Sequence, residues 1–148
     1  MTRKSKTALF AGTFNPFTLG HKSIADRALK LCDRLVIGFG SNIGKPDSNL
    51  DSNMRSVMRI YEDDSRVEVR NYTGLTVDFA RECGADFLVR GVRGSADFEF
   101  ESNLAEINLR LSGIETVILV SLPEFSFISS SMVRELKAYG HDVSKFLP

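Results

Sequence analysis

The sequence predicts an α/β fold, in which a single domain holds a five-stranded parallel sheet with helices on both faces. Two observations lead to this prediction. Short apolar segments alternate along the chain with amphipathic segments of helical spacing, and glycines directly follow several of the helical segments. With 148 residues and a hydrophobic content of 43%, the chain is long enough for one packed core and too short for two domains with separate cores. We therefore expect residues 1–148 to form one domain.

The first half of the chain contains three of the expected strands and two of the expected helices. Residues 7–11, 34–39 and 67–71 have the length and composition of strands. The helix expected over residues 21–32 places four apolar side chains on one face: Ile24, Ala28, Leu31 and Cys32. The same spacing marks the next helix at Met54, Val57, Met58 and Tyr61.

The second half continues the alternation. A helix over residues 75–83 is closed by Gly84, and a strand over residues 87–90 follows it. Another helix carries Leu104, Ile107 and Leu111 and ends before Gly113, ahead of a strand over residues 116–120. Gly140 stops the last helix, over residues 130–139. Since ligands of such sheets bind beyond the carboxyl ends of the strands, we expect the chemistry in the segments that follow the strands.

Composition restricts the kinds of partner. Lysine plus arginine number 19 and aspartate plus glutamate number 19, which argues against a nucleic-acid footprint and favours a small anionic ligand. Cys32 and Cys83 are the only cysteines, so we expect reduced packing residues inside helices and no zinc site. The basic N-terminus is followed by an apolar run that Gly12 and Asn15 interrupt too early for a signal peptide or a membrane span. We expect a cytoplasmic protein without membrane contact.

Residues 12–21, GTFNPFTLGH, join the first strand to the first helix and are the most informative segment. The unpaired N–H groups and the dipole of a helix N-terminus favour a phosphate at such a turn. His21 adds a side-chain donor there. The alternative is a tight turn in which His21 only caps the helix.

Residues 90–101, RGVRGSADFEFE, form the second informative segment. Arg90 and Arg93 follow a buried strand, with glycines that let backbone approach a ligand, and can clamp an anion. In the alternative they are an exposed pair balanced by Asp97, Glu99 and Glu101 in the next helix. A GxxG clamp for RNA is disfavoured by the order of elements and by the zero net charge.

A third segment, residues 125–134, opens the last helix with three serines, and capping explains only one of them. Lys45 follows the second strand, where a solvated surface lysine and an ammonium aimed into the cleft are equally compatible with its position. The surrounding residues 40–46 are one residue short of a P-loop, with Pro46 in place of the hydroxyl residue. Gly38, Gly40 and Gly44 also miss the dinucleotide-binding fingerprint by one residue.

Taken together, the three segments GTFNPFTLGH, RGVRGSADFEFE and FSFISSSMVRE resemble the motifs of the phosphopantetheine adenylyltransferases, a family of the T/HxGH nucleotidyltransferases. The resemblance covers almost the whole chain and implies a Rossmann-like domain. The chain departs from the usual pattern at four positions: Ala11 replaces proline, Asn15 replaces aspartate, Thr18 replaces the first histidine of many related enzymes, and Phe125 replaces tryptophan.

The resemblance also implies a reaction and a set of site residues. AMP would pass from ATP to 4′-phosphopantetheine by direct in-line attack, giving dephospho-coenzyme A and pyrophosphate, with Mg²⁺ accompanying ATP and no protein ligand to the metal. We expect His21, Lys45 and Arg93 to carry catalysis. The implied ATP contacts are Thr13, Phe14, His21, Gly91, Val92, Arg93, Glu101, Phe125, Ser126, Phe127, Ile128, Ser129, Ser130 and Ser131. The implied phosphopantetheine contacts are Thr13, Lys45, Thr76 and Arg90.

The family further implies a homohexamer and feedback inhibition by coenzyme A. Two alternatives remain at this point. One is a nicotinate-mononucleotide adenylyltransferase, which shares the GTFNP turn but usually carries a second histidine where Thr18 stands. The other is a noncatalytic nucleotide-binding α/β module, which would not require His21 together with the arginine pair.

Overall fold

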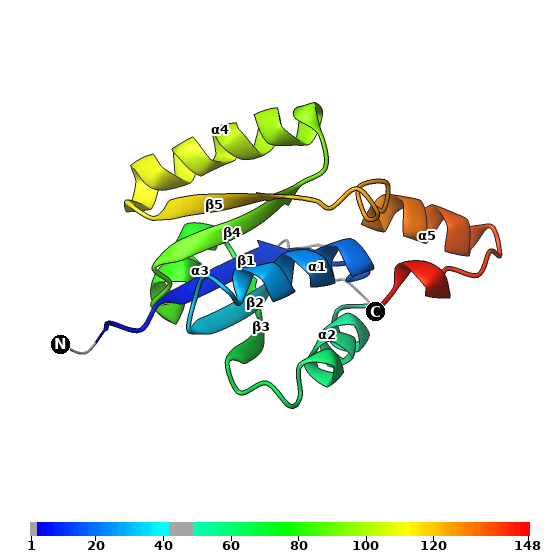
Figure 1. Cartoon of the computed structure of the whole chain (residues 1–148), viewed down its shortest axis with the longest axis horizontal. Coiled ribbons are helices and arrows are strands. Elements are labelled where there is room, and N and C mark those ends of the chain that lie inside the picture. The colour runs from blue at the N-terminus through cyan, green and yellow to red at the C-terminus, as the bar shows by residue number, and fades with distance from the viewer. Residues whose placement is uncertain (1–2, 42–48) are drawn as a thin grey trace.

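The computed structural model describes residues 3–41 and 49–148 (Figure 1). The strands are Thr7–Gly12 (β1), Arg34–Ser41 (β2), Val67–Thr73 (β3), Phe87–Val92 (β4) and Glu115–Val120 (β5). The helices are Leu19–Ala28 (α1), Leu50–Ile60 (α2), Thr76–Cys83 (α3), Ser95–Ser112 (α4) and Ser130–Ala138 (α5), followed by a short 3₁₀-helix, Ser144–Phe146 (η1). The predicted alternation of strands and helices is confirmed.

All five strands are parallel and lie in the order β3-β2-β1-β4-β5. From β1 the chain builds outward to β2 and β3, and it then returns to add β4 and β5 on the other side of β1. The strand order therefore reverses between β1 and β4, and the segments that leave these two strands flank a crevice at the carboxyl edge of the sheet. Such a switch point is where α/β sheets bind their ligands.

Helices cover both faces of the sheet, as the fold prediction requires. Ala8 and Phe10 of β1 pack in one core with residues of α1 and α2. The alternate side chain, Leu9, packs in a second core with Phe79 and Cys83 of α3. Helix α4 runs alongside β5, and α5 with η1 lies beyond the carboxyl end of β5 (Figure 1). The result is a three-layer Rossmann-like domain.

Helix α1 differs from its predicted range because it begins two residues earlier and ends at Ala28. Beyond that residue the N–H groups of Lys30 and Leu31 bond to carbonyls three positions back, which tightens the chain into a turn. Leu31 is consequently 49% exposed rather than part of the buried face. Cys32 follows the helix and is partly buried, so its predicted placement inside a helix is wrong, whereas Cys83 lies in α3 and is buried.

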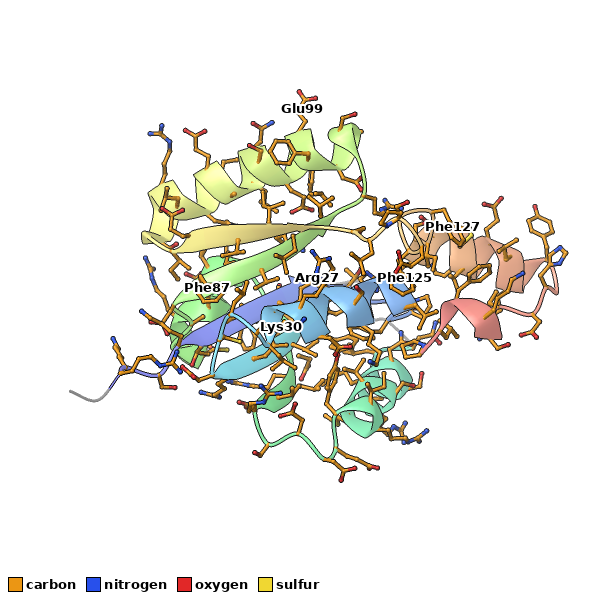
Figure 2. All side chains as sticks on the ribbon, in the orientation of Figure 1. Arg27, Lys30, Phe87, Glu99, Phe125 and Phe127 are labelled. Atoms are coloured by element: carbon orange, nitrogen blue, oxygen red, sulfur yellow. The ribbon has the colours of Figure 1, made fainter. Side chains whose placement is uncertain are left out.

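Two further observations complete the description. Arg27 of α1 donates from Nη1 to the carbonyl of Val120 at 2.8 Å, which ties this helix to the end of β5 (Figure 2). Within residues 3–41 and 49–148, no helix combines the length and the apolar character needed to cross a membrane.

Candidate active site

Two cavities that share Arg90 lie at the carboxyl edge of the sheet, one on each face. The first, which we call the α1-side cavity, has a volume of about 330 Å³ and is formed by the turn after β1, the end of β4 and the start of α5. The second, the α3-side cavity, has a volume of about 190 Å³ and lies near the start of α3, with α4 as a further wall. Arg90 and Ala11 line both cavities and form a wall that the two cavities share.

His21 and Thr18 form a capping box at the start of α1. The Thr18 hydroxyl accepts the backbone N–H of His21, and the backbone N–H of Thr18 donates to Nδ1 of His21 at 2.9 Å. Because Nδ1 accepts a hydrogen bond, a neutral His21 ring carries its proton on Nε2. The capping alternative therefore holds for Nδ1, which accepts the N–H of Thr18. The other ring nitrogen keeps an Nε2–H donor, and His21 lines the α1-side cavity.

The surroundings of His21 keep its ring neutral. Burial, followed by the positive charges of Arg90 and Arg93, lowers the pKa of His21 from 6.5 to about 4. The rings of Phe14 and Phe17 pack against it with centroids 5.0 and 5.5 Å away. The position of Thr18, where many related enzymes carry a histidine, is therefore used to orient His21.

Phe14 shapes the turn and faces inward. Its backbone has a φ of 46°, in the left-handed region, and its side chain is buried. A Cβ on Gly12 would lie 2.9 Å from the Phe14 ring, so glycine is required where this ring folds back. Any contact of Phe14 with a ligand at this turn is therefore dominated by the backbone.

The turn after β1 is held from two other elements. The Ser130 hydroxyl donates to the carbonyl of Pro16 at 2.8 Å, and Arg134 donates from Nη1 to the carbonyl of Asn15 at 2.5 Å. The amide of Asn53 in α2 donates to Oδ1 of Asn15 at 3.1 Å. Asn15, one of the departures from the family pattern, therefore links the turn to α2 and α5.

All three nitrogens of the Arg90 guanidinium donate a hydrogen bond. Nε and Nη2 each donate to Glu101 at 2.7 Å, and Nη1 donates to the carbonyl of Ala11 at 2.6 Å. Burial lowers the pKa of Arg90, but the hydrogen bonds and charge of Glu101 outweigh this effect and raise it. Glu101 is itself buried. This pair gives Arg90 a fixed position between the two cavities.

The other charges of this segment are arranged differently. Arg93 donates from its backbone N–H and from Nε to Asp97, at 3.1 and 3.0 Å, while its side chain remains largely exposed. Glu99 points away from the site on the outer side of α4 (Figure 2). The balancing of charges proposed as the alternative is therefore found for Asp97 and Glu101 but not for Glu99.

The glycines of the RGVRG segment have distinct environments. A Cβ on Gly91 would lie 2.9 Å from Cγ1 of Ile24, so this glycine allows α1 to approach β4 closely. Gly94 has open space around it and precedes the first residue of α4. Glycine at position 91 is therefore needed for the close packing of α1, a reason separate from the expected approach of the backbone to a ligand.

The three consecutive serines at the start of α5 also have separate contacts. Ser129 caps α5 by accepting the N–H of Met132 at 3.1 Å, and Ser130 holds the turn after β1. Ser131 is exposed and lies 3.5 Å from the Ser129 hydroxyl. Phe125 lines the cavity, whereas Phe127 is 62% exposed and packs on Phe146 of η1 (Figure 2).

The structure brings most of the expected site residues together. Those that line the α1-side cavity are Thr13, Phe14, His21, Arg90, Gly91, Arg93, Phe125, Ile128, Ser129, Ser130 and Ser131. Thr76 lines the α3-side cavity with Arg90. Four expected residues border neither cavity: Val92, Glu101, Ser126 and Phe127. Lys45 lies outside the described residues.

Sequence reasoning assigned no role to Arg134, which lines the α1-side cavity. Among the described residues it forms no ion pair with a carboxylate. A sequence signal for it existed, because residues four apart on a helix share a face and Ser130 is four residues earlier. Asn108 of α4, a polar residue of the α3-side cavity, had no comparable signal.

Comparisons with known proteins identify the family of the chain. The model of the family described as cytidylyltransferase-like matches residues 9–136. A phosphopantetheine adenylyltransferase of Bacteroides fragilis is 44% identical over 144 residues, which cover 97% of this chain and 96% of the relative. The corresponding protein of Phocaeicola vulgatus is 46% identical, with 97% and 95% covered.

Solved structures support the fold. A bifunctional NMN adenylyltransferase/ADP ribose pyrophosphatase from Francisella tularensis superposes with a TM-score of 0.73 at 13% sequence identity, covering 97% of this chain and 45% of the larger protein. At that identity the likeness concerns the fold alone. The full-length sequence matches, the family model and the site geometry lead to one conclusion: the chain belongs to the cytidylyltransferase-like family and, within it, to the phosphopantetheine adenylyltransferases.

Proposed function

We propose that this chain transfers AMP from ATP to 4′-phosphopantetheine, giving dephospho-coenzyme A and pyrophosphate. The observation that carries the proposal is the pair of cavities joined by Arg90, with the neutral Nε2–H donor of His21 on the α1 side. One cavity suits a nucleotide and its phosphates, and the other suits the acceptor. The relatives named phosphopantetheine adenylyltransferases support the same pair of substrates.

The α1-side cavity has the groups that bind a polyphosphate. It lies at the N-termini of α1 and α5, whose N–H groups and dipoles favour negative charge. Arg93 and Arg134 add cations, and Thr13 with the serines of α5 adds hydroxyl groups. Cations and N–H groups donate to phosphate oxygens and do not ligate a divalent metal, and no carboxylate side chain among the described residues lines this cavity. We therefore propose that ATP enters as its Mg²⁺ complex, with the ion held mainly by phosphate oxygens and water.

The α3-side cavity has the character expected for the acceptor. Leu75, Leu88 and Leu104 give it apolar walls, and Thr76 and Asn108 add hydrogen-bonding groups. An extended arm with amide groups fits such a lining. The phosphate end of the acceptor would then lie near Arg90, where the two cavities meet. Lys45 is proposed as a second cation for that phosphate.

The reaction needs positioning and charge stabilisation more than acid–base chemistry. An oxygen of the acceptor phosphate attacks the α-phosphorus of ATP in line, and the bond from that phosphorus to the β-phosphate oxygen breaks, so pyrophosphate leaves. The attacking phosphate is already an anion at neutral pH, and no proton has to be removed from it. Negative charge shifts onto the leaving phosphate, where the His21 Nε2–H and the cations stabilise it.

Pyrophosphate release tests the proposal directly. Purified protein with Mg-ATP should release pyrophosphate on adding phosphopantetheine, but not on adding nicotinate mononucleotide or pantetheine, whose hydroxyl would need a general base. Release with nicotinate mononucleotide alone would favour the other adenylyltransferase. Release with neither would favour a noncatalytic nucleotide-binding module. Comparable turnover of pantetheine would mean that the site contains a base.

Two substitutions test the residue roles. His21→Ala should lower kcat by roughly 10²- to 10³-fold, as loss of one transition-state donor does. His141→Ala, which removes the chain's other histidine, is the matched control and should leave kcat unchanged. Arg90→Ala should weaken phosphopantetheine binding more than ATP binding in calorimetric titrations. Equal losses for the two ligands would contradict the acceptor assignment.

We further propose a homohexamer in which copies meet through α4. Phe100, Ile107 and Leu111 recur at helical spacing on this helix and are all exposed, and Phe100 is 65% exposed. Ile107→Glu should reduce the mass measured by light scattering, whereas Ser102→Glu, at another exposed position of α4, should not. An unchanged mass for Ile107→Glu would exclude this face.

We propose feedback inhibition by coenzyme A at the same two cavities. Coenzyme A combines an adenine nucleotide with the pantetheine arm, so we propose that it occupies both cavities and competes with both substrates. Inhibition that neither substrate relieves would contradict this. Because ATP is a substrate, we also place the enzyme in the cytoplasm, which cell fractionation can test.

A further inference from the structure

Tyr72 lies across two glycines at the carboxyl edge of the sheet. It is paired with Gly40 of the neighbouring strand β2. A Cβ on Gly40 would lie 2.9 Å from the Tyr72 hydroxyl oxygen, and a Cβ on Gly38 would lie 3.2 Å from Cε1 of the same ring. A Cβ at 2.9 Å would require the ring to shift, and a Cβ at 3.2 Å would require it to give by a few tenths of an ångström. The two glycines therefore provide the space that the tyrosine ring occupies.

The ring of Tyr72 is fixed from its other side by α3. It stacks on Phe79 with centroids 4.4 Å apart and an angle of 6° between the ring planes. Arg70 in turn lies over the Phe79 ring, with its guanidinium carbon 5.0 Å from the centroid. With glycines beneath and an aromatic ring above, the phenol has little rotational freedom, so the position of its hydroxyl is determined by packing.

The Tyr72 hydroxyl contacts the Thr76 hydroxyl at 2.8 Å. Thr76 is the first residue of α3 and lines the α3-side cavity, which Tyr72 itself does not border. Burial raises the pKa of Tyr72, and the hydrogen bond with Thr76 and the positive charge of Arg90 oppose this only in part. Tyr72 is consequently a neutral phenol that reaches the acceptor cavity only through Thr76.

We propose that Tyr72 is a positioning residue for the acceptor substrate, because its hydroxyl fixes the orientation of the Thr76 hydroxyl in the α3-side cavity. A threonine hydroxyl rotates freely when it has no partner. Once one of its hydrogen-bonding directions is taken by Tyr72, the other is directed to a ligand, and the amide groups of the pantetheine arm can use it. Loss of the Tyr72 hydroxyl should weaken the binding of phosphopantetheine and not the binding of ATP, since Thr76 lines the α3-side cavity and not the α1-side cavity.

The inference rests on the proposed adenylyl transfer, and steady-state kinetics can test it. Tyr72→Phe keeps the ring and its stacking and removes only the hydroxyl. It should raise the KM for phosphopantetheine by about three- to tenfold, the effect of losing one hydrogen bond, with kcat and the KM for ATP within about twofold of wild type. Tyr61→Phe is the matched control, because its hydroxyl bonds to Asp26 at 2.8 Å on the opposite face of the sheet. It should change neither KM.

A double-mutant cycle separates positioning from a general structural effect. Thr76→Val should raise the KM for phosphopantetheine, and Thr76→Ser, which keeps the hydroxyl, should restore it. In the Thr76→Val background, Tyr72→Phe should have no further effect. If Tyr72→Phe does not fold, the Thr76 variants still test the inference. An equal KM for phosphopantetheine in Thr76→Val and Thr76→Ser would show that the Thr76 hydroxyl has no role.

The outcomes distinguish this inference from the proposed function. If the wild-type protein releases no pyrophosphate with phosphopantetheine, the proposed function fails and this inference fails with it. If the wild type is active, three results overturn the inference alone: an unchanged KM in Tyr72→Phe, additive effects in the double mutant, or an equal rise in the KM for ATP.

Discussion

Lowering the pH should destabilise this protein through His21. The pKa of the folded state is lowered to about 4, whereas the same group has a pKa of 6.5 in the unfolded chain. Between these values the unfolded chain binds more protons, so the free energy of unfolding rises with pH in this interval. The contribution is complete above pH 6.5 and is lost as the pH falls toward 4. A difference of about 2.5 in pKa corresponds to at most about 3 kcal/mol.

The structural cause is the capping box. A proton added to Nδ1 would face the backbone N–H of Thr18, which donates to the same atom at 2.9 Å. Two donors would then point at one another at the start of α1. His21→Gln is the informative comparison, because glutamine at this position of a capping box can accept the same N–H and does not titrate.

Chemical denaturation at several pH values measures the effect. Between pH 7 and pH 4.5 the wild type should lose more stability than His21→Gln, and the two curves should run in parallel above pH 6.5. Histidine ¹⁵N spectra add a direct readout, since the chain has two histidines and His141→Gln leaves only the signals of His21. They should show a neutral ring protonated on Nε2 with a midpoint near 4. A midpoint of 6 or above, or a proton on Nδ1, would refute the reasoning.

Three further substitutions test the packing of the site. Glu101→Gln removes the charge that faces Arg90 and leaves a half-buried guanidinium poorly paired. It should lower the free energy of unfolding by about 2 kcal/mol in urea denaturation. An unchanged midpoint of unfolding would show that water replaces the lost carboxylate contact. Gly91→Ala places a methyl group 2.9 Å from Ile24 and should cost about 1–3 kcal/mol by the same measurement, whereas a neutral effect would mean that α1 can shift. Thr18→Val removes the cap of α1 and should lower the free energy of unfolding by about 1 kcal/mol, which thermal melting can measure. An unchanged melting temperature would contradict this.

Local patterns were sufficient to predict the elements and the region of the site. Apolar spacing and helix-stop signals identified the five strands and the five α-helices but not the 3₁₀-helix η1. Gly84, Gly113 and Gly140 marked helix ends because each has a φ between 68° and 83°, which glycine adopts without strain. The motifs at the ends of β1 and β4 fell beside each other because parallel strands end at the same edge of a sheet. These properties depend on neighbours within a few residues, so the sequence contains them directly.

Only the tertiary structure decided what each side chain contacts. The pairing of Glu101 with Arg90, the use of Gly91 for close packing on Ile24, and the separation of Thr76 into a second cavity all depend on how different elements pack against one another. The proton position on His21 was likewise decided by a backbone N–H whose direction is fixed by the turn after β1. Such contacts depend on the order of the strands and on the close packing of helices against them. A periodic sequence pattern specifies which face of an element is buried, but the partner that covers that face is chosen by the packing of the whole domain.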